Sequence, residues 1–440
     1  MKWFVLALAI VMYALVISFK NKKLYFTSAA ALLILILGML APGKIFPLPE
    51  DVIALDNTMS MHTFALTHAF EDIINWNVIL IYLGSMILAS LFIYSKVPVR
   101  LADSGLAMLT LFAMTGILSM FIQSLTALVL MTPIALQLCK KRNKNPAPFI
   151  IGLTVVSNLE GAATLLGSPH SMIFAGYAGF SFNDFFFHSG KPSVFFIIQA
   201  VFIIACLFFY FIFTRGVEEK VEIEKTPVVS YFPLFLLVAM IAGLVVLSFI
   251  HTPFTCLSGA FVVALGLLGL VWYRFFQKQN SNTTYTLMRE LDWESIFFLA
   301  GLFIVIGAVK ATGLLNDFAL FLSSVTAGSK LSIFLIIILL SVVISGFVDN
   351  IPYMIAMLTV ADSLAQAIGA SPELYTLALL IGTCLGGNLT PLGSSANIVS
   401  MGIMKKEGYQ IKFSDWFKIG LPFTLLTTGT AAMLLWLLWA

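Results

Sequence analysis

Charged residues are scarce in this chain of 440 residues, because Asp, Glu, Lys and Arg together make up only 10% of it. Soluble domains contain about 25% charged and about 45–50% apolar residues, whereas 60% of this chain is hydrophobic and its mean hydropathy is +1.01. The composition therefore excludes a soluble domain and predicts an integral protein that crosses the membrane several times. The net charge of +3 comes from short, scattered clusters and forms no extended basic face for nucleic acid.

Cysteine and histidine are also few, and neither forms a recognisable motif. The four cysteines lie in or beside apolar runs without metal-ligand spacing, so we interpret them as reduced packing residues. The sequence contains no HExxH motif and no nucleophile–base pattern, which argues against a resident cofactor and against an enzyme. Residues 1–18 have almost no charged n-region and no small-residue cleavage site, so we expect a first span there and not a secretory signal.

Long apolar runs dominate the rest of the chain. Taking about 20 apolar residues per crossing, we predict complete spans near residues 2–19, 25–41, 74–95, 192–214, 231–250, 253–273, 293–311 and 417–438. Two composite regions lie between them. Each is expected to contain a re-entrant hairpin, near 101–139 and 328–367, followed by an interrupted crossing, near 149–181 and 374–404.

The predicted fold is thus an all-α integral membrane protein with about ten crossings. We divide it into residues 1–73, with N-terminal spans and an acidic outer loop, residues 74–214, the first repeat, residues 215–291, a charged linker and two scaffold spans, and residues 292–440, the second repeat. The linker includes the charged run from Val217 to Thr226, to which we assign no function.

The distribution of Lys and Arg supports this layout, because cytoplasmic loops are enriched in both. Assigning Lys20, Lys22 and Lys23 to the cytoplasm puts most other basic residues on the same side and leaves outside Lys2, Lys44, Lys191, Lys310 and Lys330. Both termini are then expected on the outer side of a bacterial cytoplasmic membrane. The first hairpin would enter from the cytoplasm and the second from outside, so the halves would be inverted copies.

One pattern occurs twice in the chain, with a constant offset between its two copies. The first copy runs FIQSLTALVLMTP from Phe121 and continues to the run TLLGS that begins at Thr164; the second runs FVDNIPYMIAMLT from Phe347 and continues to TPLGS from Thr390. Polar segments interrupted by Gly and Pro, in corresponding halves of an apolar chain, are typical of the binding site of a secondary transporter.

A helix broken inside a membrane needs partners for its backbone groups, so each break indicates a cavity or a protein-lined pocket. Half-helices that start at the breaks would direct partial positive charge at an anionic substrate. A sodium ion is expected near Ser157, Asn158, Asn350 and Asn388. We predict that substrate or ion is bound by Gln123, Ser124, Thr126, Ser157, Asn158, Gly161, Thr164, Gly167, Ser168, Asn350, Pro352, Gly387, Asn388, Thr390, Gly393, Ser394, Ser395 and Asn397.

Two acids, Glu160 and Asp349, lie within these segments. Carboxylates are costly in a bilayer unless they face a cavity or bind a cation, so a coupling ion, Na⁺ or H⁺, is their expected partner. The alternative is that Glu160 is merely paired with a cation or with backbone amides. Lys310 is expected to extend to the membrane surface, and His170 either gates the site or caps a half-helix.

The runs SNLEGAATLLGSPHSMIFAG from Ser157, FSFNDFF from Phe180, FVDNIP from Phe347, GGNLTPLGSSANIV from Gly386 and FSDWFKIGLP from Phe413 resemble the ion transporter superfamily. The resemblance is to its branch of arsenite permeases and the pink-eyed-dilution P protein. This branch is related to sodium/proton antiporters of the D type and, more distantly, to sodium-coupled dicarboxylate and citrate carriers. It implies a homodimer whose hairpins and broken helices move as an elevator against a scaffold.

Three positions depart from that family pattern. The first hairpin tip has Gln123-Ser124 where the family commonly has Asp-Asn, and Glu160 stands where Gly is common. Our hypothesis is that Glu160 takes over the electrostatic role of the missing hairpin aspartate. The resemblance therefore does not fix the cargo or its stoichiometry.

A secondary carrier, a channel and an enzyme are the three classes of function to compare for a membrane protein of this kind. Interrupted repeats favour a secondary carrier, whereas a channel needs a continuous polar pore and an enzyme needs a catalytic constellation. We expect cation-coupled transport of a small anion or oxyacid, arsenite-like or carboxylate-like. The alternative is a sodium/proton antiporter without an organic substrate.

Overall fold

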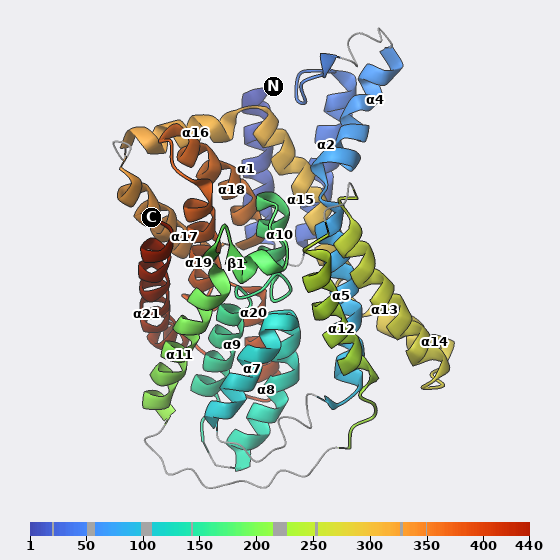
Figure 1. The fold of residues 1–440 in the computed structure, drawn as a ribbon, viewed down its shortest axis with the longest axis vertical. Helices are drawn as coiled ribbons and strands as arrows, with labels where there is room; N and C mark the ends of the chain where they lie inside the picture. Colours follow the sequence, from blue (N-terminus) through green and yellow to red (C-terminus); the bar gives the residue numbers. More distant parts are fainter. Residues whose placement is uncertain are drawn as a thin grey trace. The chain divides into compact units, whose positions relative to one another are not determined.

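The computed structural model describes residues 1–19, 22–50, 58–97, 108–141, 144–213, 227–250, 254–325, 329–348 and 350–440 (Figure 1). Several sequence predictions fall outside these residues: Asp349, the start of the first hairpin at 101–107, the whole charged run from Val217 to Thr226, and part of the acidic outer loop. The chain divides into two compact units, and several chain segments contribute to each.

The first unit contains residues Met1–Ile79, Asp292–Ile333 and Ile355–Pro372. Its complete helices are α1 (Lys2–Ser18), α2 (Lys23–Leu40), α4 (Thr58–His68), the π-helix η2 (Ala69–Ile73), α15 (Trp293–Ala311) and α16 (Leu314–Val325). Four helices have residues in both units: α5 (Trp76–Tyr94), α17 (Lys330–Ser345), α18 (Asn350–Ala367) and α19 (Pro372–Gly386), of which only Pro372 lies in the first unit.

The second unit contains residues Leu80–Leu291, Phe334–Met354 and Glu373–Ala440. Its elements are α7 (Met108–Phe121), α8 (Ser124–Lys141), α9 (Ala147–Glu160), α10 (Pro169–Ala178), the 3₁₀-helix η3 (Asn183–Phe185), β1 (Phe187–His188), β2 (Lys191–Pro192), α11 (Val194–Phe213), α12 (Phe232–Leu247), α13 (Leu257–Phe275), α14 (Ser281–Arg289), α19 (Pro372–Gly386), α20 (Ser395–Lys406) and α21 (Phe413–Trp439).

Each of the eight predicted complete spans is a helix in the structure, as α1, α2, α5, α11, α12, α13, α15 and α21. Six helices in the described part of the chain are long and apolar enough to cross a membrane: α2, α5, α11 (to Ile212), α13, α15 and α21. Shorter apolar helices include α1, α9, α12, α17 and α19. The chain is therefore an integral membrane protein, as its composition predicts.

In the first unit, close packing of α2 on α15 depends on a glycine. A Cβ atom built at Gly301 would lie 3.0 Å from Cγ2 of the buried Thr27 on α2. Small residues at such contacts allow apolar helices to approach closely where water cannot drive their association. Gly301 thus has a packing role.

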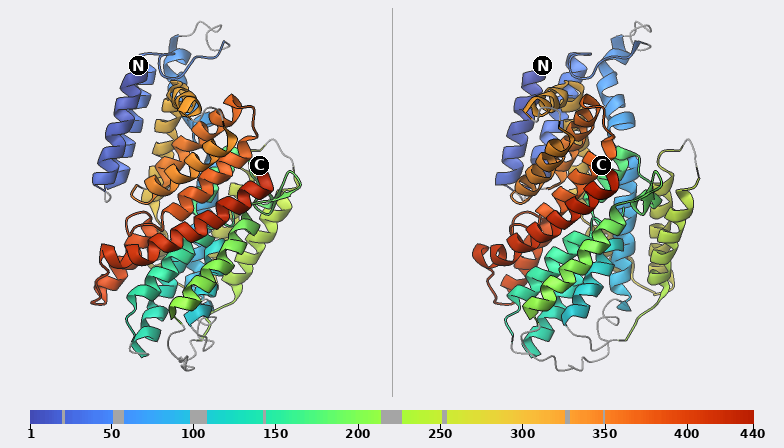
Figure 2. Two further views of the ribbon diagram at one scale, coloured as in Figure 1. Left: turned by 90° about the vertical axis from the view of Figure 1, so that its left-hand side faces the viewer. Right: turned by 60° about the vertical axis from the view of Figure 1, so that its left-hand side comes forward.

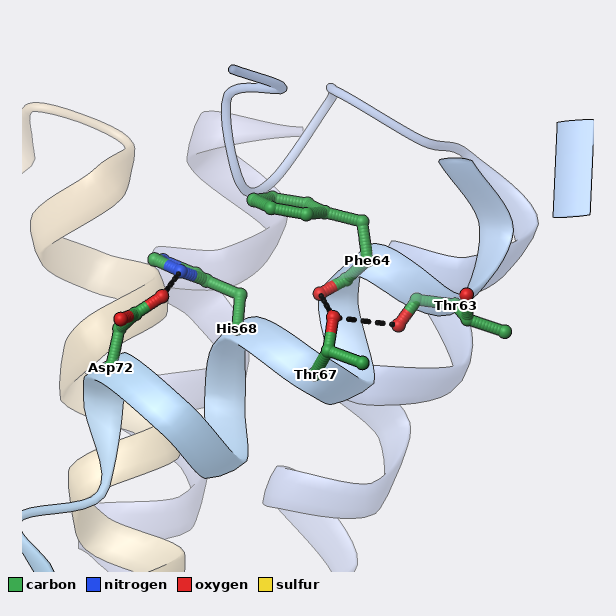
Figure 3. A network of polar contacts seen from close by, with 5 residues as sticks. All are labelled: Thr63, Phe64, Thr67, His68 and Asp72. Carbon is green, nitrogen blue, oxygen red and sulfur yellow. Dashed lines mark hydrogen bonds and ion pairs between the residues drawn. The ribbon is translucent and has the colours of Figure 1, made fainter. Parts of the chain in front are cut away.

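Three α-helices, the π-helix η2 and a short sheet were not predicted. Residues 58–73, expected as part of an outer loop, form α4 and η2, where His68 Nδ1 bonds Asp72 Oδ2 at 2.7 Å and the Thr67 hydroxyl donates to backbone oxygens (Figure 3). Helices α14 and α16 are short, and β1 pairs with β2 as an antiparallel hairpin. A search for 20-residue apolar runs misses these elements because they are short or carry polar residues.

In the second unit, α7, α8 and α9 pack against one another, and α11 packs on both α9 and α21. Figure 2 shows the long C-terminal helix α21, drawn in red, running beside the green α11. The end of α21 is anchored, because Trp439 Nε1 donates to the Pro192 carbonyl at 3.1 Å. Lys191 lies over the same indole ring, 5.4 Å from its centroid.

The loop before β1 is held by a half-buried acid. Burial alone would raise the pKa of Asp184, but hydrogen bonds from the Ser181 hydroxyl and from His188, followed by that from the Ser181 amide, hold its pKa below the ordinary value. His188 also stacks on Phe180 with ring centroids 4.2 Å apart. Asp184 therefore joins η3 to the hairpin that anchors α21.

Because the folded-state pKa of Asp184 is lowered, its contribution to stability is present above the unfolded pKa of about 3.9 and is lost as pH falls through the folded value. We expect Asp184→Asn to lower the thermal unfolding midpoint of detergent-purified protein at neutral pH. The deficit relative to the unsubstituted chain should shrink in acid.

The matched control is Asp72→Asn, which removes the same Asp–His contact where the carboxylate side chain is 66% exposed. Exposed pairs contribute little, so we expect a smaller shift of the midpoint. An equal effect of both substitutions at every pH would contradict the structural role of Asp184.

Candidate functional site

Two helix–break–helix elements form the centre of the second unit. Helix α9 ends at Glu160 and α10 begins at Pro169, while α19 ends at Gly386 and α20 begins at Ser395. Each second helix has a serine N-cap, since Ser168 Oγ accepts from the Ser171 amide and Ser394 Oγ accepts from the Ala396 amide, both at 3.3 Å. Serine is a favoured residue at this position because it satisfies a backbone donor left open by the helix start.

The two breaks use the same threonine contact at equivalent positions of the repeat. The Thr164 hydroxyl donates to the Met120 carbonyl at the end of α7, and the Thr390 hydroxyl donates to the Gly346 carbonyl after α17. Each hydroxyl oxygen also accepts from the amide two residues later, at 3.2 Å. At the breaks, some backbone amides and carbonyls have no partner within a regular helix. The threonine hydroxyls form hydrogen bonds with them, as an interruption inside an apolar unit requires.

The helices before each break, α7 and α8 in the first half and α17 and α18 in the second, are bonded to it at equivalent positions. In the first half, Ser119 Oγ and Ser157 Oγ lie 2.6 Å apart, and Ser124 Oγ donates to the Ser157 carbonyl at 2.8 Å. In the second half, Ser345 Oγ donates to both the Thr383 carbonyl and the Asn350 side chain. The offset that relates Thr164 to Thr390 also relates Ser119 to Ser345, Ser124 to Asn350, and Ser157 to Thr383.

Glycines allow the backbone segments of each break to touch. A Cβ at Gly167 would lie 2.7 Å from the Ser119 carbonyl oxygen, and a Cβ at Gly393 would lie 2.6 Å from the Gly387 carbonyl oxygen. Real Cβ atoms do not approach oxygen that closely, so both positions require glycine. Similar crowding surrounds Gly161, whose Cβ would lie 2.4 Å from Ser124 Oγ.

Asparagines connect the two breaks. Asn158 Nδ2 donates to Asn388 Oδ1 and to Asn397 Oδ1, both at 2.9 Å, and Asn158 Oδ1 accepts from Ser394 Oγ at 3.2 Å. Asn397 Nδ2 in turn donates to the Gly387 and Thr390 carbonyls at 2.8 Å. We call Asn158, Asn388, Ser394 and Asn397 the asparagine cluster.

The cluster is polar, buried and uncharged. Asn388 and Asn397 are 0% exposed, and none of the ion pairs in the described part of the chain touches the cluster. Amide and hydroxyl groups can bind either an anion, through their donors, or a cation, through their oxygens. The cluster is therefore a suitable place for a small polar solute.

A second contact between the halves involves a cysteine. The residue that corresponds to Asn158 in the second half is Cys384, whose thiol is in hydrogen-bond contact with the Ser168 side chain. Asn158 meets Ser394 in the same way from the other half. The contact recurs at equivalent positions, but an amide stands on one side and a thiol on the other.

Helix α21 is also tied to the second break. Trp416 is 0% exposed, and its Nε1 donates to the Asn388 carbonyl at 3.0 Å. A Cβ at Gly420 would lie 2.6 Å from the same oxygen. The start of α21 thus contacts the backbone of a cluster residue.

Glu160 does not join the cluster. It is 0% exposed, and its Oε2 accepts from Gln199 Nε2 on α11 at 2.8 Å. Its predicted companion, Asp349, lies outside the described residues, so the proximity of these two acids stays a prediction.

Other predicted residues have varied surroundings. Gln123 is buried at the first hairpin tip, and its Nε2 has no hydrogen-bond partner among the described residues. Thr126 is half-buried near the start of α8, Pro352 lies in the first turn of α18, and Ser395 is exposed. They contribute to none of the cluster bonds given above.

Asn158 is one of the residues predicted to lie near a sodium ion. In the structure, both polar atoms of its side chain are hydrogen-bonded to other protein groups. The part of the chain that the structure describes contains no group of three or more His, Cys, Asp and Glu residues that could hold a metal ion. Asn158 therefore acts as a link between the halves.

Sequence reasoning missed Ser119, Ser345, Gln199, Cys384 and Trp416. The serines share the offset of the two breaks, so extending the paired pattern upstream would have found them. Cys384 was interpreted as a packing residue, and it is buried and forms no disulfide within the described residues. Its contact with Ser168 has no signal in the sequence.

The glycine contacts give a direct test of the break geometry. A Cβ at Gly393 meets three carbonyl oxygens, those of residues 345, 346 and 387, within 3.0 Å, so Gly393→Ala should destabilise the protein by about 1–3 kcal/mol. Thermal unfolding in detergent measures the change. Gly402→Ala on α20, where a Cβ meets nothing within 4 Å, is the matched control and should leave the midpoint unchanged or raise it slightly. Equal midpoints for both variants would refute the close backbone approach.

Known proteins share this chain's sequence and fold. Residues 13–382 match the citrate transporter family. The chain is 30% identical over 376 residues to an uncharacterized transporter from Mycobacterium bovis, covering 83% of this chain and 86% of that protein, and 30% identical over 386 residues to a 46 kDa membrane protein from Mycobacterium leprae, covering 84% and 88%.

More distant proteins extend the comparison. The mouse P protein is 23% identical over 451 residues, covering 82% of this chain and 54% of that protein. The crystal structure of the YdaH transporter from Alcanivorax borkumensis matches with a TM-score of 0.60 and 16% identity, covering 93% of this chain and 96% of the other. These matches confirm the resemblance predicted from the paired motifs. The chain belongs to the citrate transporter family, within the ion transporter superfamily.

Proposed function

We propose that the protein is a secondary active transporter that moves a small anion or oxyacid across the membrane, coupled to Na⁺ or H⁺. The observation that carries this proposal is the asparagine cluster, where Asn158 beside one break bonds Asn388 and Asn397 at the other. Interrupted helices whose ends meet at one point are the usual binding-site architecture of such carriers. A carboxylate such as citrate, which gives the family its description, is the first substrate to test.

Helix ends support an anionic substrate. Both α10 and α20 begin at the breaks, and the N-terminal end of a helix carries a partial positive charge of about half a unit. Amide groups of the cluster can add hydrogen-bond donors. An anion bound there would compete for the bonds that now join Asn158 to its partners.

We further propose that the halves are inverted in the membrane and that hairpins and broken helices move together as an elevator in each protomer of a homodimer. The equivalent contacts of Thr164 and Thr390 support a repeat, and the distribution of Lys and Arg supports opposite orientations. Both termini would then face outwards.

Sodium/proton exchange without an organic substrate is the second candidate. The buried carboxyl group of Glu160 favours it, because a carboxylate inside a membrane protein commonly serves an ion pathway. An arginine is the usual partner of a carboxylate, and the asparagine cluster contains none, so it supports an anionic substrate less strongly than a site with an arginine would. Flux measurements separate the two candidates.

Purified protein in proteoliposomes should be screened for flux of citrate, dicarboxylates, arsenite and sodium under imposed pH and sodium gradients. We expect saturable, gradient-driven uptake of one anion or oxyacid. Proton movement driven by sodium alone would favour the second candidate, and single-channel currents would contradict a carrier.

The same assay tests the cluster. Asn158→Ala removes the donor to the buried Asn388 Oδ1 and Asn397 Oδ1, at about 1–3 kcal/mol per group, so uptake should fall by about tenfold or more. Asn282→Ala, at an exposed position on α14, is the control and should retain full uptake. Normal uptake by the Asn158 variant would remove the cluster from the proposed site.

Orientation has its own test, using single cysteines and a membrane-impermeant maleimide on intact cells. Lys144→Cys, between α8 and α9, should react only when the cytoplasmic side is opened, whereas Ala370→Cys, between α18 and α19, should react from outside. Labelling of both positions from the same side would contradict inverted halves.

A further inference from the structure

A buried acid lies on the side of α9 that faces away from the asparagine cluster. Residues of a helix rotate by about 100° each, so Glu160 and Asn158, two positions apart, project in nearly opposite directions. The Glu160 carboxyl group contacts Gln199 on α11, and its Cγ lies 3.1 Å from where a Cβ of Gly116 would stand. Phe202 lines the same space, 2.8 Å from that Cβ position.

Few groups around the Glu160 carboxyl group could stabilise a negative charge on it. Gln199 Nε2 is shared between Glu160 Oε2 and the Met120 sulfur, at 2.8 and 3.3 Å. Glu160 Oε1 is buried and has no hydrogen-bond partner among the described residues. No ion pair described for the chain includes Glu160. Because an isolated buried carboxylate is costly, the group requires a bound positive charge.

Among the described side chains, no titratable group on the neighbouring helices forms an ion pair with Glu160. Helix α7 carries none within Met108–Phe121, and α11 offers Cys206, which interacts electrostatically with Glu160 but brings no positive charge. The remaining titratable groups on the elements that pack against α9 are Tyr210 on α11, Cys139, Lys140 and Lys141 at the end of α8, Lys405 and Lys406 at the end of α20, and Asp415 and Lys418 at the start of α21.

We infer that Glu160 and Gln199 form a proton-binding site, separate from the asparagine cluster, that makes transport depend on pH. A hard metal cation needs several oxygen ligands, but the side chains of Met120 and Phe202 beside Glu160 contain no oxygen, and Gly116 has no side chain. A proton needs one carboxyl oxygen, and Gln199 can stabilise the neutral acid by donating to the other. The equivalent position in the second break is Gly386, so one half alone carries this site.

Infrared difference spectroscopy tests proton binding without any substrate. The full-length protein in lipid should show the C=O stretching band of a protonated carboxyl group near neutral pH, and Glu160→Gln, which keeps the shape of the side chain, should remove it. Gln199→Met removes the donor and should shift the band to higher frequency. Glu290→Gln, an exposed carboxylate on the chain segment after α14, is the control and should change neither. Absence of the band, or its persistence in Glu160→Gln, overturns the inference.

Transport measurements test the pH dependence expected from proton binding at Glu160, and this test rests on the proposed function. With the substrate found in the flux screen, the unsubstituted protein should vary in uptake by up to about tenfold per pH unit, the limit for one proton, and Glu160→Gln should lose that dependence. An unchanged pH profile in the variant overturns the inference and leaves the transport proposal standing. Absence of flux of every ion tested would defeat the transport proposal, while the infrared result still decides proton binding at Glu160.

Discussion

The centre of this protein depends on one constraint, which is that a helix interrupted inside an apolar unit must find partners for the backbone groups it exposes. Threonine hydroxyls at Thr164 and Thr390, together with serines on the hairpins, supply these partners from side chains. Each break is consequently bound to the hairpin that precedes it. A change at any of these hydroxyls would affect two segments at once.

Features that depend on local sequence could be predicted, whereas contacts between segments far apart in the sequence could not. Apolar runs and the shared offset depend on local pattern, so the spans and both breaks could be predicted. The contacts of Asn158 with Asn388 and Asn397 could not, because they depend on how two segments from opposite halves of the sequence pack. The contact of the Glu160 side chain with Gln199 also depends on packing, because it joins α9 to α11. Helices α4 and α16 are too short to be found by a search for runs that match the membrane thickness.

The repeat is regular in its backbone contacts and irregular in its chemistry. Thr164 and Thr390 make the same bonds, but Asn158 corresponds to Cys384 and Glu160 corresponds to Gly386. The hydroxyl contacts of Thr164 and Thr390 use the same residue type in both halves, whereas residues that could bind a solute differ between the halves. The polar solute and any accompanying proton would therefore meet an asymmetric environment within a nearly symmetric framework.

Helix α21 joins two distant points of the second unit. Trp416 near its start holds the Asn388 carbonyl, and Trp439 at its end holds the Pro192 carbonyl. At a rise of about 1.5 Å per residue, the helix spans roughly 35 Å between these indoles. A rearrangement of the second break that moves the Asn388 backbone would also move the start of α21, and the helix, which contains Pro422, would pass part of that displacement to the β1–β2 loop.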